Sequence, residues 1–96
     1  MKRYVLSPPA RSDLDAIWDY TASNWNIEQA EIYLRHIKRS IEAIADNLRL
    51  GRACDEIRAG YRKHPAGSHV LFYRLNDAGV DIVRILHGRM DFSGHL

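Results

Sequence analysis

Basic residues gathered in the second half of this chain are the side chains best suited to bind an anionic partner or act on it. Residues 49–96 hold eight Lys or Arg against five Asp or Glu, whereas residues 1–48 hold six against seven. Aromatic residues interleave with them, and the whole set is Arg58, Tyr61, Arg62, Lys63, Phe72, Tyr73, Arg74, Arg84 and Arg89. Arginine beside aromatic rings can bind nucleic acid through phosphate contacts and stacking, or anchor an acidic protein segment. A solvated sheet edge without a partner is the third interpretation.

His69 and His87 are the candidates for acid–base chemistry, because imidazole changes its protonation near neutral pH. Hydrogen-bonded strand residues would give the same pattern. Neither histidine has another ligand at metal-binding spacing, and Cys54 is the only cysteine, so we expect no metal site, cofactor or disulfide. Ser68 precedes His69 directly on a strand, where neighbouring side chains point to opposite faces. Nucleophilic catalysis is therefore not expected.

Three short apolar runs carry these side chains and predict a small antiparallel sheet. The runs are Gly60–His64, Ser68–Arg74 and Asp81–His87, and the turn signals Pro65-Ala66-Gly67 and Asn76-Asp77-Ala78-Gly79 separate them. We expect residues 52–56 to be a linker and the strands to begin near Ile57.

The last of these runs is apolar on both faces, which predicts a strand in the centre of the sheet. Val83 and Ile85 should share one face, and Ile82, Arg84 and Leu86 the other. A charge inside such a strand needs a partner, because an unpaired buried charge is costly.

A short strand and two helices are predicted ahead of the sheet. The strand spans Lys2 to Leu6, and Ser7 before Pro8 is a helix start that should lead to an end near Ser23-Asn24. The apolar stripe of this helix is Ala10, Leu14, Ile17, Trp18, Thr21 and Trp25, and we expect the two tryptophans to serve core and helix-hairpin packing.

The second helix is predicted over residues 27–47. Asn26 with Gln29 three residues later forms the signature of an N-terminal cap. Its stripe is Ala30, Leu34, Ile37, Ile41, Ile44 and Leu48. Because the connection between the helices is very short, they should form an antiparallel hairpin.

The predicted element order is β-α-α-β-β-β, an α+β fold in which a helical hairpin packs on a small, mainly antiparallel four-stranded sheet. A length of 96 residues predicts a single domain over residues 1–96. An apolar fraction of 46% argues against disorder. Neither a signal peptide nor an apolar stretch of about 18 residues is present in the sequence, so we expect no membrane partner and a cytoplasmic location.

The chain resembles the ParE toxins of bacterial type II toxin–antitoxin pairs, within the RelE/ParE superfamily. The resemblance covers essentially the whole chain. Its segments are Leu6-Ser7 before the helix start, Asp13-Leu14-Asp15-Ala16-Ile17-Trp18-Asp19-Tyr20, Gly60-Tyr61-Arg62, Ser68-His69-Val70-Leu71-Phe72-Tyr73-Arg74, Ile82-Val83-Arg84-Ile85-Leu86-His87 and Met90-Asp91.

The resemblance implies a non-enzymatic inhibitor of DNA gyrase, neutralised by direct binding of a ParD-type antitoxin whose disordered segment folds as it binds. Operator DNA would be bound only indirectly, through the antitoxin. We place the antitoxin contacts on Arg58, Tyr61, Arg62, Lys63, Tyr73, Arg74 and Arg84. For gyrase, we expect a free tail after Gly88 that carries Arg89, Phe92 and His95, with a frayed terminus as the other interpretation.

The resemblance also leaves an enzyme as the alternative, a ribosome-dependent mRNA endoribonuclease of the RelE type. Nuclease-active relatives carry an arginine after the histidine of the third strand, where this chain has Val70. Arg84 and His87 are three apart on a strand and should point to opposite faces. These departures favour gyrase inhibition. An inactive stabilisation protein, which binds only its partner and operator DNA in complex, is the third hypothesis.

Overall fold

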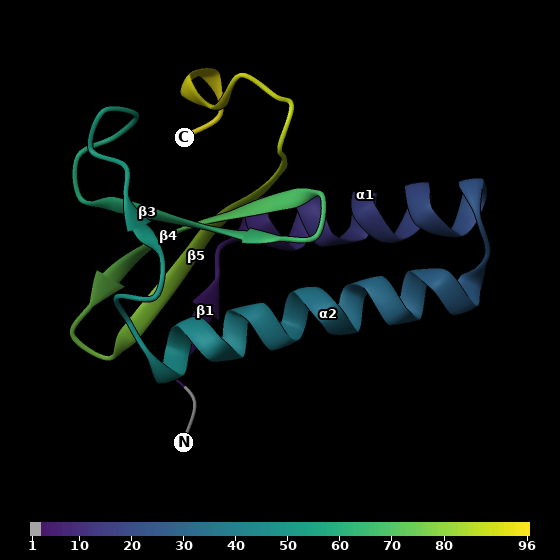
Figure 1. Ribbon diagram of the computed structural model, residues 1–96, viewed down its shortest axis with the longest axis horizontal. Helices are drawn as coiled ribbons and strands as arrows, with labels where there is room; N and C mark the ends of the chain where they lie inside the picture. The colour runs from purple at the N-terminus through teal and green to yellow at the C-terminus, as the bar shows by residue number, and fades with distance from the viewer. Residues whose placement is uncertain (1–2) are drawn as a thin grey trace.

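The computed structural model describes residues 3–96, which form a helical hairpin beside a five-stranded sheet (Figure 1). The elements follow the chain as β1 (Tyr4–Leu6), α1 (Pro8–Asn24), α2 (Ile27–Asp46), β2 (Arg52–Ala53), β3 (Tyr61–Ala66), β4 (His69–Asn76), β5 (Gly79–His87) and the 3-10 turn η1 (Phe92–Gly94). The predicted α+β class is confirmed. Lys2, the predicted start of the first strand, lies outside the described residues.

Both helices begin at the predicted caps. The Ser7 hydroxyl accepts a hydrogen bond from the Ala10 amide at 3.1 Å, and Pro8 occupies the first turn, where its missing N–H costs nothing. The Asn26 side chain accepts from the Gln29 amide at 2.8 Å. Because only residues 25–26 connect them, the two helices lie antiparallel, as Figure 1 shows. Neither helix, within the described residues, is long and apolar enough to cross a membrane.

The sheet has the strand order β1-β5-β4-β3-β2, with β1 parallel to β5 and every other pairing antiparallel. The predicted count of four strands is one too low. Arg52–Ala53, predicted as part of a linker, pairs with β3, and a strand of two residues is too short to show alternation. The third strand begins at Tyr61 instead of near Ile57, because residues 54–60 form a turn in which Cys54 O accepts two backbone N–H groups.

A β-bulge in β5, the interior strand between β1 and β4, corrects the predicted assignment of faces. Phe72 is opposite Arg84 while Tyr73 is opposite Ile82, so Val83 is an extra residue on β5. Ile82 and Ile85 consequently share the face toward the helices, and Val83 and Leu86 share the other. Period-2 reasoning fails here because it assumes an unbroken ladder.

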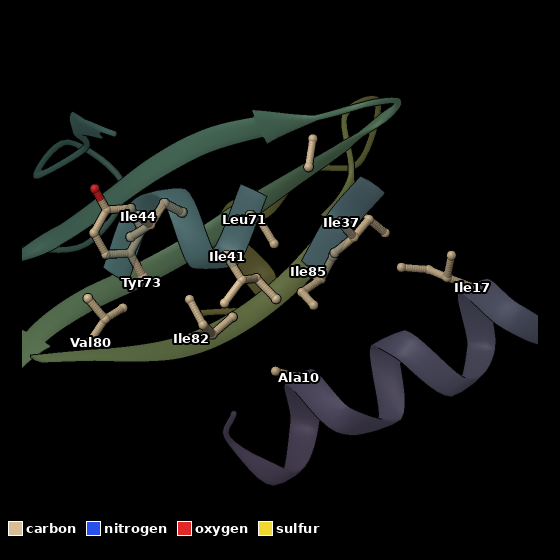
Figure 2. Close-up of a cluster of buried hydrophobic side chains, with 11 residues drawn as sticks. Ala10, Ile17, Ile37, Ile41, Ile44, Leu71, Tyr73, Val80, Ile82 and Ile85 are labelled. Atoms are coloured by element: carbon tan, nitrogen blue, oxygen red, sulfur yellow. The ribbon is translucent and has the colours of Figure 1, made fainter. Parts of the chain in front are cut away.

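The helix-covered face holds the main core, in which Ile37, Ile41 and Ile44 of α2 meet Leu71, Tyr73, Ile82 and Ile85 of the sheet (Figure 2). The opposite face holds a smaller cluster made of Cys54, Tyr61, Phe72 and Leu86. Trp18 is half-buried, but Trp25 is 74% exposed, so its predicted packing in the core or the helical hairpin is wrong. Trp25 ends α1 as its C-cap, beyond the reach of the sheet core.

Candidate functional site: a groove between the helical hairpin and the sheet

A groove of about 820 Å³ lies between the helical hairpin and the end of the sheet. Its lining is largely apolar and includes Ala16, Ile17, Tyr20, Thr21, Trp25, Gln29, Tyr33, Ile85, Leu86 and Met90. Three of the lining side chains are unusually exposed for their size: Trp25 at 74%, Tyr20 at 68% and Met90 at 38%. Large apolar side chains gathered in one open concave surface are typical of a binding site.

Tyr33, His69 and His87 form a polar cluster in the wall of this groove. The Tyr33 hydroxyl lies 2.6 Å from Nδ1 of His69 and accepts a hydrogen bond from the Ser68 amide at 2.9 Å. The rings of His69 and His87 meet edge to face with their centres 5.3 Å apart. Burial lowers the pKa of His69, and the neighbouring His87 lowers it further.

Arg84 has the partner that its place in an apolar strand requires. Its Nε and one terminal nitrogen each donate to the Asp13 carboxylate at 2.8 Å, a bidentate ion pair that raises the pKa of Arg84. Asp13 also accepts from the Ile85 amide at 2.9 Å. The other terminal nitrogen of Arg84 donates to the His95 carbonyl at 3.0 Å. Arg84 therefore ties α1 to both β5 and the C-terminal segment.

Arg84 and His87 leave β5 on opposite faces, as predicted. Arg84 pairs with Phe72 of the smaller cluster, whereas His87 pairs with His69. Both side chains nevertheless reach one groove, which His69 also lines. Arg84 reaches it because β1 pairs with β5 only as far as Ile82, so the side chain turns around a strand edge that α1 covers.

The seven predicted antitoxin residues fall into three groups. Arg58 and Arg74 are exposed; Arg58 lies over the Tyr61 ring at 5.3 Å, and Arg74 pairs with Asp81 at 3.2 Å. Arg62, Lys63 and Arg84 are half-buried, and Tyr61 and Tyr73 are buried.

Besides Arg84, two more of these seven residues make hydrogen bonds inside the fold. The Arg62 guanidinium donates to Gly51 O at 2.6 Å and to Arg49 O at 3.3 Å, so it holds the segment after α2. The Tyr73 hydroxyl donates to Leu48 O at 3.1 Å and accepts from Gly51 N at 2.8 Å. A Cβ at Gly51 would lie 2.6 Å from that hydroxyl, which is why glycine is required there.

The predicted gyrase residues lie on a tail that folds back instead of extending freely. Phe92 packs edge to face on Phe72, with ring centres 4.7 Å apart, and Leu96 joins the same cluster. The expectation of a free tail is therefore wrong, because the apolar face opposite the helices needs a cover. Arg89 and His95 remain exposed on this folded segment.

Tyr33, Asp13 and the exposed Tyr20 were not singled out as site residues by the sequence analysis. Tyr33 could have been found, because it lies three residues after Ala30 and four before Ile37, on the predicted apolar face of α2. Asp13 offered only its position near the start of a helix, which is where any acidic residue is favoured.

Comparison with known proteins identifies the family. Residues 4–92 match the family model described as the ParE toxin of the type II toxin-antitoxin system, parDE. Toxin ParE1 of Mycobacterium tuberculosis (strain H37Rv) is 55% identical over 95 residues, which cover 98% of this chain and 97% of that protein. Toxin ParE1 of Caulobacter vibrioides is 45% identical over 96 residues, covering 100% and 99%.

A solved structure described as a chromosomal ParDE TA system from P. aeruginosa has the same fold. It superposes with a TM-score of 0.79 at 20% identity, over 91% of this chain and 96% of that one. With a family model that spans nearly all of its length, the chain belongs to the ParE toxin family of type II toxin–antitoxin systems.

Proposed function

We propose that this toxin arrests growth by binding and inhibiting DNA gyrase, without catalysing a reaction of its own, and that a ParD-type antitoxin neutralises it by direct binding. The observation that carries the proposal is the groove of about 820 Å³ with Tyr20, Trp25 and Met90 exposed in it. An open, apolar groove of this size suits a protein segment. Because both proposed partners are cytoplasmic proteins, we infer that this toxin acts in the cytoplasm.

In this proposal the antitoxin binds through two kinds of contact, apolar contacts in the groove and charged contacts with the basic residues. Apolar anchors of the antitoxin's disordered segment would enter the groove, where large apolar side chains are already exposed. Acidic residues of the same segment would meet the exposed Arg58 and Arg74 and the half-buried Lys63. The remaining four predicted residues would support this surface indirectly, by holding the backbone and side chains on which the contacts form. They are Tyr61, Arg62, Tyr73 and Arg84. Operator DNA would be bound only through the antitoxin.

Charge reversal at Arg58 and Arg62 tests the antitoxin surface. We expect the double variant Arg58→Glu, Arg62→Glu to weaken antitoxin affinity by more than about tenfold. Each substitution replaces an attraction to the acidic segment with repulsion between like charges. Arg58→Glu alone is the safer variant for folding, since Arg62 bonds the backbone after α2. Arg35→Glu on the exposed side of α2 is the matched control. Unchanged affinity in the double variant would remove both residues from the interface.

Supercoiling of a relaxed plasmid tests the gyrase target directly. The purified, antitoxin-free protein should inhibit gyrase or trap its cleaved DNA complex, and added cognate antitoxin should reverse the effect. A folded protein that arrests growth yet leaves supercoiling unchanged would contradict the proposal.

The proposed contact residues for gyrase are Arg89, Phe92 and His95. Deleting residues 89–96 would also uncover Phe72, so loss of toxicity in that truncation would not by itself separate contact from folding. Arg89→Ala and His95→Ala change exposed side chains only and should reduce gyrase inhibition in a folded protein. Full inhibition by both variants would exclude these two side chains as gyrase contacts.

A ribosome-dependent endoribonuclease is the second candidate, because one groove holds the imidazoles of His69 and His87 together with Arg84. Bases and a cation around one cavity could take a 2′-hydroxyl proton and stabilise charge on a phosphate. Mapping of transcript ends after induction separates the two candidates. Cleaved transcripts that disappear in His69→Ala would favour the nuclease, and intact transcripts during growth arrest would favour gyrase.

A further inference from the structure

We propose that His69 and His87 form a binding site for a divalent transition-metal ion of the zinc class, open to the groove. Their spacing along the sequence predicted no metal site, but strand pairing places the two residues directly opposite each other on β4 and β5. The Gly88 amide donates to Ser68 O at 2.9 Å, so the adjacent pair Ser68/Gly88 is the hydrogen-bonded one. His69/His87 is consequently a non-hydrogen-bonded pair, the position at which opposed side chains lie closest in an antiparallel ladder.

The separation of the two rings suits a shared ion. Their centres are 5.3 Å apart and their planes are inclined at 78°. An ion about 2.0–2.1 Å from one nitrogen of each imidazole, in tetrahedral geometry, would hold the ring centres roughly 5 Å apart. Imidazole is a preferred ligand of zinc, copper and nickel, whereas magnesium and calcium prefer oxygen. The spacing of the two rings therefore allows a shared ion, and their imidazole nitrogens favour the first class.

Tyr33 supplies the outer contact that orients a ligating histidine. A tyrosine hydroxyl has one proton to donate and two lone pairs to accept. All three are used when the Ser68 amide and Nδ1–H of His69 donate to Tyr33 Oη, which in turn donates to the Ala66 carbonyl at 3.5 Å. We assign this tautomer from the network. It leaves Nε2 of His69 unprotonated, which is the form that binds a metal ion.

His87 is the more adjustable of the two ligands. Its Nδ1 accepts a hydrogen bond from the Arg89 amide at 3.2 Å, and the side chain is exposed. Coordination through Nε2 would shift the ring proton to Nδ1 and release the Arg89 amide to water. Because that amide is at the surface, water replaces the lost contact at little cost.

Two histidines leave coordination positions open toward the groove. Within residues 3–96, no group of three or more His, Cys, Asp or Glu side chains is placed to hold a metal ion. Water would fill the remaining positions in the free toxin, and a donor from a molecule in the groove could replace that water. The pair is thus an open site and not a closed structural one.

Calorimetric titration of the tag-free protein with zinc chloride tests this site. We expect saturable binding of one ion per chain, and at least about tenfold weaker binding in His87→Gln, which changes only an exposed side chain. Tyr33→Phe removes only the orienting hydroxyl and should weaken binding by about tenfold. His36→Ala, at an exposed histidine of α2, is the matched control and should bind as the unmodified protein does.

Nuclear magnetic resonance of the imidazole protons supplies a readout that is independent of affinity. Substoichiometric zinc should move the ring signals of His69 and His87 and leave those of His36 and His64 in place. Absence of saturable binding, or equal affinity in His87→Gln and the unmodified protein, would overturn the proposal. Neither result bears on gyrase inhibition, so the two proposals fail separately.

Discussion

The two faces of the sheet are covered in different ways. Among the described residues, the face toward α1 and α2 buries eleven side chains in one cluster (Figure 2). The opposite face buries four. Two long helices cover the first face. The second is covered by residues 54–60 and by the C-terminal segment through Phe92 and Leu96. Figure 1 shows this segment lying apart from the helices.

This difference distinguishes the region that contributes most to the stability of the fold from the region that can open more easily. Regions with few buried apolar contacts open at lower free energy than the core. The C-terminal segment is held by its ring contact with Phe72 and by the bond from Arg84 to His95 O. Most of the residues that line the groove come from α1, α2 and the helix-covered face, with Leu86 and Met90 added from the other side. The proposed gyrase residues all lie on the C-terminal segment, which is the less extensively packed cover.

The largest effect should follow from a cavity in the helix-covered face. Ile41 is 3% exposed, and Ile41→Ala should lower the free energy of unfolding by about 2–5 kcal/mol through lost burial and a residual cavity. Urea denaturation measures this. Ile32→Ala on the same helix, 48% exposed, is the control and should change stability by less than about 0.5 kcal/mol. Equal losses in both variants would break the comparison.

The second-largest loss of stability is expected at the Asp13–Arg84 pair, which connects α1 to β5 and, through His95 O, to the C-terminal segment. Asp13→Ala removes the acceptor for the Arg84 guanidinium and the Ile85 amide, and should cost about 2–3 kcal/mol. The side chains of this pair are only 13% and 22% exposed, so solvent screens them weakly. Asp15→Ala, an exposed neighbour on α1, is the control. A loss below about 0.5 kcal/mol would show that the pair is not structural.

On the face opposite the helices, Phe92→Ala should lower the free energy of unfolding by about 1 kcal/mol. The effect is small because the edge-to-face contact with Phe72 is partly exposed. The buried Cys54 reports the same change locally. Burial, followed by the charge of Glu56, raises the pKa of its thiol, so a thiol reagent should react slowly with the native protein. Phe92→Ala should accelerate that reaction and Phe92→Leu much less. Fast labelling of the unmodified protein would mean that the face is already open.

The smallest effect is expected at the far end of the β4–β5 hairpin. Arg74 and Asp81 form an ion pair at 3.2 Å in which the arginine side chain is 57% exposed. Asp81→Asn should change stability by no more than about 0.5–1 kcal/mol, because water and salt screen such pairs. Repeating the measurement in high salt should remove most of the difference. A loss as large as that of Asp13→Ala would contradict the role of burial in this ranking.

Much of the fold could be predicted because its signals are local. The caps at Ser7 and Asn26 and the stripe of α2 act within a few residues, so sequence spacing reveals them directly. The two-residue β2 and the bulge at Val83 were missed because neither leaves such a pattern. The need of Arg84 for a partner was visible in its apolar surroundings, whereas the identity of Asp13 as that partner was not.

By itself the sequence determined the α+β class, both helices, the three long strands and, through its resemblance, the family. Tertiary structure alone decided which residues meet in the groove: it brought Tyr33 to His69, His69 to His87, and Asp13 to Arg84. It also folded the C-terminal segment onto Phe72. The physical reason is that helix caps and stripes depend on neighbours along the chain, while these contacts depend on strand register and packing between distant segments.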